Sequence, residues 1–269
     1  MKKLATALVS AAAIMTMSTT AFAAENPAEV FDRVMEKNNT IQSAEIQSGV
    51  HSVILAKDVI PDGQMKVDMA MHAEMDMQDT TDLKYLAQVA SSILGQDSYS
   101  QVFYTDGYYY VDANGVKLKY PMPLEQIISS VQTGVNTSNM ESSYMKGISL
   151  NEVNGKRVLA YEANPKKLNK SVKEALGTVM NTLGTDVNLD MNIQEMKGAY
   201  VLDDNDYIIY MTNYIVYNME VLDQPMTCIT LMETEVQNPG EPVVVTLPST
   251  DGYEDLIGLY DGVIESEVE

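Results

Sequence analysis

The stretch from Met65 to Met77, which reads MKVDMAMHAEMDM, constrains the fold more than any other part of the sequence. Its odd-numbered residues are all apolar and mostly methionine, whereas its even-numbered residues are mostly charged or polar. A period of two is typical of a β-strand with one buried face. Because strands usually have about five or six residues, the stretch predicts an unusually long strand.

The methionine side of this strand indicates a binding surface. Methionine is flexible and polarizable, and it lines surfaces that adapt to varied partners. We therefore expect an apolar ligand, such as a lipid or an acyl chain, to bind against it in a hydrophobic cavity. An ordinary core uses the same residue types, so a filled core remains the alternative. The predicted wall consists of Met65, Val67, Met69, Met71, Met75, Met77, Leu189, Met191, Ile193 and Met211.

Copper(I) is a second possible ligand, because the segment 69–75 resembles sites rich in methionine and histidine, and thioethers are soft ligands. On a strand, however, His72 points away from every methionine of the run. A helix would place Met71 and Met75 one turn apart, but the alternation does not fit a helix. We therefore rank a copper site below an apolar ligand and predict no cofactor.

The first residues have the features of a secretory signal peptide. Lys2 and Lys3 precede an apolar segment from Leu4 to Met17, and Ala21-Phe22-Ala23 matches the A-x-A cleavage pattern. We expect residues 1–24 to be removed and the mature protein to be secreted, or extracytoplasmic, without a transmembrane segment. No cysteine follows the expected cleavage site, so we expect no lipid anchor on an N-terminal cysteine.

The charge of the chain excludes some classes of partner. Its 38 acidic and 17 basic residues give a formal net charge of −21, which repels nucleic acids and anionic membranes. An envelope polymer or a protein remains a possible partner. One lysine cluster and one tyrosine cluster could contact it: Lys166, Lys167, Lys170 and Lys173, and Tyr104, Tyr108, Tyr109 and Tyr110.

The sequence favours a protein that is not an enzyme. Its two histidines, His51 and His72, both fall on predicted strands, and we find no nucleophile elbow, zinc-protease, P-loop or dinucleotide motif. The acidic run 203–206 lacks the spacing of a calcium-binding EF-hand, so we interpret it as a solvated turn. Cys228 is the only cysteine, and we expect a buried thiol without a disulfide partner.

The rest of the chain predicts about eleven strands and four helices. Asn26-Pro27 and Asn164-Pro165 have the residues of a helix cap followed by the first helical position. Asp-Gly and Asn-Gly pairs predict type I′ hairpin turns at 106–107, 114–115 and 154–155. The helices are expected at 26–38, 80–94, 123–131 and 164–183. The strands are expected at 41–56, 65–77, 102–104, 108–111, 116–120, 148–153, 156–162, 187–202 with a bulge near Glu195-Met196, 207–221, 225–236 and 242–247.

This order of elements, with the closing segment Val243-Val244-Val245-Thr246-Leu247-Pro248, resembles the LolA/LppX-like superfamily of lipoprotein carriers, in a secreted Gram-positive branch. The resemblance implies an α+β fold, with a strongly curved antiparallel sheet (a half-barrel of about eleven strands) and helices packed on its concave face. It also implies a cavity that holds lipid or acyl chains. We expect one such domain over residues 25–248 and an acidic C-terminal tail at 249–269, which we predict to be partly disordered.

Overall fold

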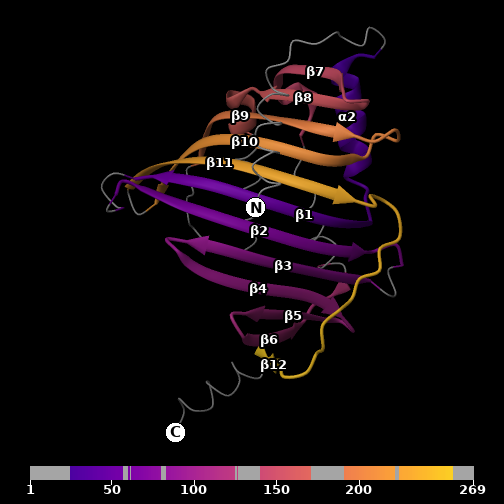
Figure 1. The fold of residues 1–269 in the computed structure, drawn as a ribbon, viewed down its shortest axis with the longest axis vertical. Helices are drawn as coiled ribbons and strands as arrows, with labels where there is room; N and C mark the ends of the chain where they lie inside the picture. Colours follow the sequence, from indigo (N-terminus) through magenta and orange to yellow (C-terminus); the bar gives the residue numbers. More distant parts are fainter. Residues whose placement is uncertain are drawn as a thin grey trace. The chain divides into compact units, whose positions relative to one another are not determined.

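The computed structural model describes residues 25–56, 60, 62–79, 83–124, 126, 140–170, 191–221 and 224–256. Within these residues, the strands form one sheet in the order β12-β6-β5-β4-β3-β2-β1-β11-β10-β9-β8-β7 (Figure 1). The elements are α2 (Pro27–Asn38), β1 (Ser43–Leu55), β2 (Gln64–Asp76), β3 (Lys84–Ile93), β4 (Gln96–Thr105), β5 (Tyr108–Ala113), β6 (Val116–Pro121), the 3₁₀ turn η1 (Ser142–Tyr144), β7 (Met145–Val153), β8 (Lys156–Ala163), β9 (Asn192–Leu202), β10 (Ile208–Val221), β11 (Gln224–Gln237) and β12 (Glu254–Asp255).

The sheet is mainly antiparallel. Neighbouring strands run antiparallel from β3 to β6 and from β7 to β11, and β12 is parallel to β6. The described residues divide into two compact units. The first unit lies within Met1–Asn38, Gly49–Asp68 and Ser138–Glu235, and the second within Asn39–Ser48, Met69–Thr137 and Val236–Glu269.

The core of the first unit lies between α2 and one side of strands β7 to β10. The Asn26 side chain caps α2 by accepting a hydrogen bond from the Ala28 amide at 3.1 Å, which confirms the predicted cap. The apolar stripe of the helix, Val30, Phe31, Val34 and Met35, is buried. It packs against strand residues that include Leu150, Leu159, Tyr161, Ile193, Tyr200, Leu202 and Ile208.

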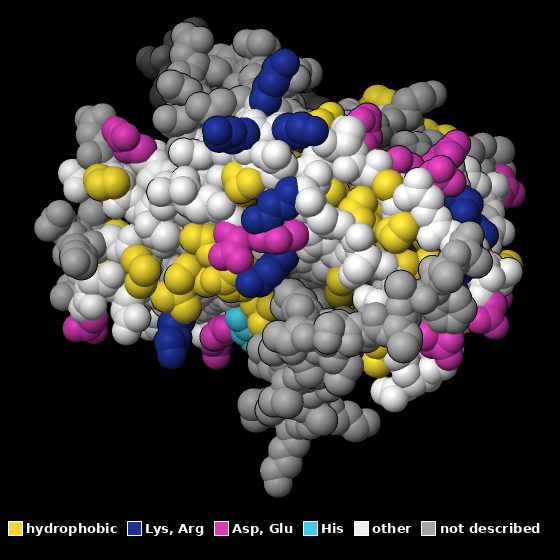
Figure 2. Space-filling view, turned by 90° about the horizontal axis from the view of Figure 1, so that it is seen from above, with side chains coloured by type: hydrophobic (Ala, Val, Ile, Leu, Met, Phe, Trp, Pro, Cys, Tyr) yellow, Lys and Arg dark blue, Asp and Glu magenta, His cyan; other side chains and the backbone are white. Residues whose placement is uncertain are grey.

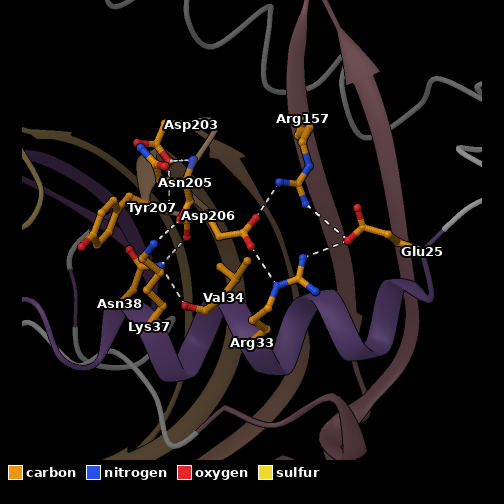
Figure 3. A network of polar contacts seen from close by, with 10 residues as sticks. All are labelled: Glu25, Arg33, Val34, Lys37, Asn38, Arg157, Asp203, Asn205, Asp206 and Tyr207. Atoms are coloured by element: carbon orange, nitrogen blue, oxygen red, sulfur yellow. Dashed lines mark hydrogen bonds and ion pairs between the residues drawn. The ribbon is translucent and has the colours of Figure 1, made fainter.

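A network of ion pairs holds α2 to the turn between β9 and β10 (Figure 3). Asp206 accepts hydrogen bonds from Arg33 Nε at 2.8 Å and from Arg157 Nη1 at 2.5 Å. Arg33 also reaches Glu25 at 2.9 Å. At the helix end, Asn38 donates to the Asp206 carbonyl at 3.0 Å. The solvated turn predicted at 203–206 is therefore wrong for Asp206, which is partly buried between two arginines.

In the second unit, the C-terminal segment covers one side of strands β3 to β5. Val243, Val245 and Leu247 follow an extended path without strand pairing and pack with Tyr253 against Leu86 and Phe103. The Tyr253 ring stands edge-on to Phe103 at a centroid distance of 5.6 Å. We call residues 241–253 the strap. The strand predicted at 242–247 is therefore wrong, and Tyr253, within the predicted acidic tail, is buried.

Most predicted strands and all three predicted type I′ turns are confirmed, with Asp106, Asn114 and Asn154 at φ values of 52–53°. The bulge predicted in β9 is present at Gln194, one residue before its expected place. The helix predicted over 80–94 is wrong, because residues 84–93 form strand β3 and pair with β4 from Tyr85 to Ile93. The helix at 123–131 lies almost wholly outside the described residues. The helix at 164–183 is described only as far as Lys170.

The predicted packing of helices on a concave face of the sheet is not confirmed. The described part of the chain shows α2 against one side of the first unit. Leu168, from the start of the second Asn-Pro helix, joins the same core, and Asn164 caps that helix by accepting from the Lys166 amide at 3.1 Å.

Candidate functional site

The two sides of β2 can be assigned from a contact with the strap. Glu74 Oε2 accepts a hydrogen bond from the amide of Thr246 at 3.4 Å, and the neighbouring strap residues pack on Leu86 and Phe103. The even-numbered side chains at this end of β2 therefore point to the strap side. Because side chains alternate along a strand, Met69, Met71 and Met75 point to the other side.

The methionines of β2, and Met77 directly after it, differ in how much solvent they contact. In the second unit, Met75 and Met77 are buried, but Met69 is 39% and Met71 is 36% exposed. In the first unit, Met65 and Val67 are half-buried. Strand β2 is an interior strand, with β1 on one side and β3 on the other. Apolar side chains in the middle of such a strand are normally buried by other parts of the protein. The exposure of two methionines there marks a place where burial is incomplete.

A row of four tyrosines lies on the methionine side of the second unit. Tyr85 pairs with Tyr104, Tyr104 with Tyr109, and Tyr109 with Tyr120, across strands β3 to β6. Each of these tyrosines is next in the sequence to a residue whose side chain faces the strap. Because successive side chains of a strand point to opposite sides, the tyrosine row faces away from the strap. The next row on the same side is aliphatic and pairs in the same way: Ala87, Val102, Val111 and Leu118.

The tyrosine row is uncharged at neutral pH. Burial, with a smaller effect of Tyr85 and Tyr120, raises the pKa of Tyr109 to about 12. Burial also raises the pKa of Tyr85 and of Tyr120. The Tyr104 hydroxyl donates to the carbonyl of Met122 at 3.3 Å. We call the four second-unit methionines and these two rows the methionine–tyrosine face: Met69, Met71, Met75, Met77, Tyr85, Tyr104, Tyr109, Tyr120, Ala87, Val102, Val111 and Leu118.

Sequence reasoning found only part of this face. It grouped Tyr104 and Tyr109 with Tyr108 and Tyr110, although the register places Tyr110 on the strap side, stacked on Phe103 at 4.6 Å. It missed Tyr85, because the segment was predicted to be helical. The short, mostly apolar run at residues 85–89, which is compatible with a strand covered on both sides, was the signal that could have revealed it.

The remaining predicted wall residues lie elsewhere. Ile193 is buried in the core of the first unit, and Met211 packs against the same core. Both contribute to packing around α2. Met191 is half-buried just before β9, and Leu189 lies outside the described residues.

The two histidines lie among carboxylates. His72 Nε2 is 3.2 Å from Glu74 Oε1, and its Nδ1 is 3.9 Å from Glu45 Oε1. His72 therefore points away from Met71, as the alternation predicts. His51 Nδ1 is 2.7 Å from Asp68. Within the described ranges, no group of three or more His, Cys, Asp or Glu side chains is arranged to hold a metal ion.

Charged and hydrophobic side chains are both present on the surface. Figure 2 shows Lys and Arg side chains beside Asp and Glu side chains, with hydrophobic side chains scattered over the same face. Among the described residues, ion pairs join Lys146 to Glu162 at 2.5 Å and Lys197 to Glu195 at 2.9 Å. None of the described helices is long and apolar enough to cross a membrane.

The model of one protein family, described as a family of unknown function (DUF6612), matches residues 26–248. The chain belongs to the DUF6612 family. No curated protein matches this DUF6612 chain.

Two solved structures are similar to this DUF6612 chain at low identity. LprF from Mycobacterium bovis has 10% identity and a TM-score of 0.35, with 83% of this chain and 97% of LprF covered. A β-barrel-like protein of the DUF1849 family from Brucella abortus has 12% identity and a TM-score of 0.24, with 74% of this chain and all of that chain covered. The LolA/LppX-like resemblance of this DUF6612 chain stays a prediction.

Proposed function

We propose that this DUF6612 protein is a secreted, non-catalytic binding protein that holds a lipid, an acyl chain or another apolar ligand against the methionine–tyrosine face. The observation that carries the proposal is the exposure of Met69 and Met71 in the middle of an interior strand. A ligand that binds against Met69 and Met71 would cover apolar surface that the described residues leave exposed.

The chemistry of the face suits an apolar chain. Its groups are thioethers, aliphatic side chains and neutral phenols, and such a lining needs few polar contacts to retain a ligand. Burial of each methylene contributes about 0.8 kcal/mol, so a chain of ten carbons gains roughly 8 kcal/mol before the cost of association. Methionine side chains adapt to ligands of different shape. We therefore expect a preference for ligand length over a particular headgroup.

The test combines ligand identification with probe binding. The protein is purified from its host and extracted, and bound lipid is sought by mass spectrometry. The extracted protein is then titrated with a fluorescent fatty acid. We expect co-purified lipid, and we expect a double substitution, Met69→Gln with Met71→Gln, to weaken probe binding at least tenfold, since two thioether contacts become polar.

The matched control is Leu55→Gln at the end of β1, because the 38% exposure of Leu55 is close to the 39% of Met69 and the 36% of Met71. This variant should bind the probe as the unchanged protein does. A protein without lipid and without probe binding would refute the proposal and favour an envelope interaction or sensing module with a filled core. Equal losses in the control and the double variant would show that the effect is not specific to the face.

A further inference from the structure

The hairpin of β3 and β4 extends beyond β5, its neighbour on one side. The two strands pair up to Ile93 and Gln96, whereas β4 pairs with β5 only from Ser100 onward (Figure 1). The last contact with the β5–β6 turn is the pair of hydrogen bonds between Tyr99 and Asn114. Residues 96–98 of β4 therefore lack a neighbouring strand on the β5 side.

Leu94 occupies the apex of this hairpin in an unfavourable conformation. Its φ is +53° and that of Gly95 is +76°, as a type I′ turn requires. The three other hairpin turns of this type place Asp106, Asn114 and Asn154 at the position of Leu94. Leucine lacks the polar side chain that eases the left-handed conformation for Asn and Asp. Leu94 is nevertheless 70% exposed, so it gains little from packing within the protein.

The composition of the tip is also unusual for this chain. From Ala90 to Tyr99 the sequence reads ASSILGQDSY, and Asp97 is its only charged residue although the chain has a net charge of −21. Ile93 and Tyr99 are exposed beside the apex. Aliphatic residues at an apex with a tyrosine behind them are typical of segments that enter a membrane interface, where tyrosine keeps its hydroxyl in the wet layer.

We propose that the β3–β4 tip is a membrane anchor, in which Leu94 and Ile93 insert into the surface of an uncharged lipid bilayer and Tyr99 lies at the headgroup level. A protein partner fits less well, because stable protein interfaces bury about 800 Å² on each side, and three side chains at a projecting turn offer far less. A bilayer needs no complementary surface. The acidic charge of the chain repels anionic lipids, so the neutral bilayer is the expected partner.

The test uses the full mature chain and sedimentation with phosphatidylcholine vesicles. We expect the unchanged protein to sediment with the vesicles, and phosphatidylglycerol vesicles to bind it more weakly. Leu94→Asn should lower the partition coefficient about tenfold, since a buried leucine is lost. Asparagine suits a positive φ, so the variant should melt at the same temperature or higher, which separates lost anchoring from lost folding.

Two further variants complete the design. Val244→Asn removes an aliphatic side chain that is 89% exposed on the strap and should leave partitioning unchanged. Leu94→Trp introduces the only tryptophan of the chain, whose emission should shift to shorter wavelength when vesicles are added. Leu94 is not part of the methionine–tyrosine face, so probe binding and vesicle binding can fail separately. The proposal is overturned if the unchanged protein stays in the supernatant, if Leu94→Asn and Val244→Asn behave alike, if the tryptophan emission does not move, or if Leu94→Asn changes only the oligomeric state.

Discussion

Replacing Asp206 by asparagine should destabilise the first unit by about 2 kcal/mol at neutral pH, mainly through the loss of charge-assisted hydrogen bonds. The Asp206 side chain is 17% exposed and accepts from both Arg157 and Arg33. Because Asp206 belongs to the β9–β10 turn and Arg33 to α2, the change weakens the attachment of the helix (Figure 3).

The magnitude follows from the exposure of each partner. A hydrogen bond to a charged group contributes roughly 1.5–3 kcal/mol when it is sheltered, which applies to Arg157. Arg33 is 49% exposed, so solvent screening reduces its contribution to about 0.5 kcal/mol. Asparagine keeps the shape of the side chain and one hydrogen-bond acceptor. The expected loss of stability therefore lies near the lower end of the combined contributions of Arg157 and Arg33. Arg157 would then retain Glu25, at 3.8 Å, as a charged partner.

The loss should depend on pH with a defined sign. Burial alone raises the pKa of the Asp206 carboxyl, but the hydrogen bonds and charges of Arg33 and Arg157 outweigh it, so the pKa lies below the ordinary 3.8. A lowered pKa gives a contribution that is complete above the ordinary value and disappears as the pH falls through the lowered one. The difference between the unchanged protein and the variant should therefore shrink below about pH 4.

Urea unfolding followed by circular dichroism at pH 7, 5 and 3 measures this difference. Asp204→Asn is the matched control, because it removes one carboxylate from the same turn at an exposed position, and it should change stability by less than about 0.5 kcal/mol. Equal stability of Asp206→Asn and the unchanged protein at pH 7 would refute the reasoning, as would a difference that persists undiminished at pH 3.

Other substitutions test packing. Gly198→Ala should destabilise by about 3 kcal/mol in urea unfolding, because an added Cβ would lie 2.5 Å from the Thr212 carbonyl oxygen; a tolerated alanine would contradict the contact. Tyr253→Ala should cost about 3 kcal/mol and make the strap sensitive to protease, since the ring packs on Phe103; unchanged stability would argue against a packed strap. The thiol of Cys228, which is buried, should react with a thiol reagent only after unfolding, and fast reaction of the folded protein would contradict its placement.

The sequence predicted those parts of the fold in which local chemistry and burial agree. Strand β2 alternates because one side is apolar and the other polar, so its pattern is visible without knowledge of its neighbours. The Asp-Gly and Asn-Gly turns were predictable because a positive φ at two successive positions admits few residue types. The Asn26 cap was predictable for the same reason, since few side chains satisfy the first helical amides.

The parts that sequence reasoning missed depend on partners distant along the chain. Asp206 pairs with arginines 173 and 49 residues away, and nothing near it in the sequence indicates either partner. Strand β3 was mistaken for a helix because it has apolar residues on both sides, so the alternation is lost and the apolar positions fall by chance at helical spacing. Its pairing with β4 overrides that local preference.

Strand β3 has apolar side chains on both sides of the sheet. Of these two sides, the methionine–tyrosine face is the better candidate for a ligand site. On the strap side, Leu86 and Phe103 are buried together with strap residues, and Glu74 of β2 accepts a hydrogen bond from the strap. On the other side, Tyr104 and Met75 are buried while Met69 and Met71 are not. The apolar side of β2 is therefore buried at one end and exposed farther along the strand. A bound apolar ligand would cover the exposed part, and the probe titration tests whether such a ligand binds.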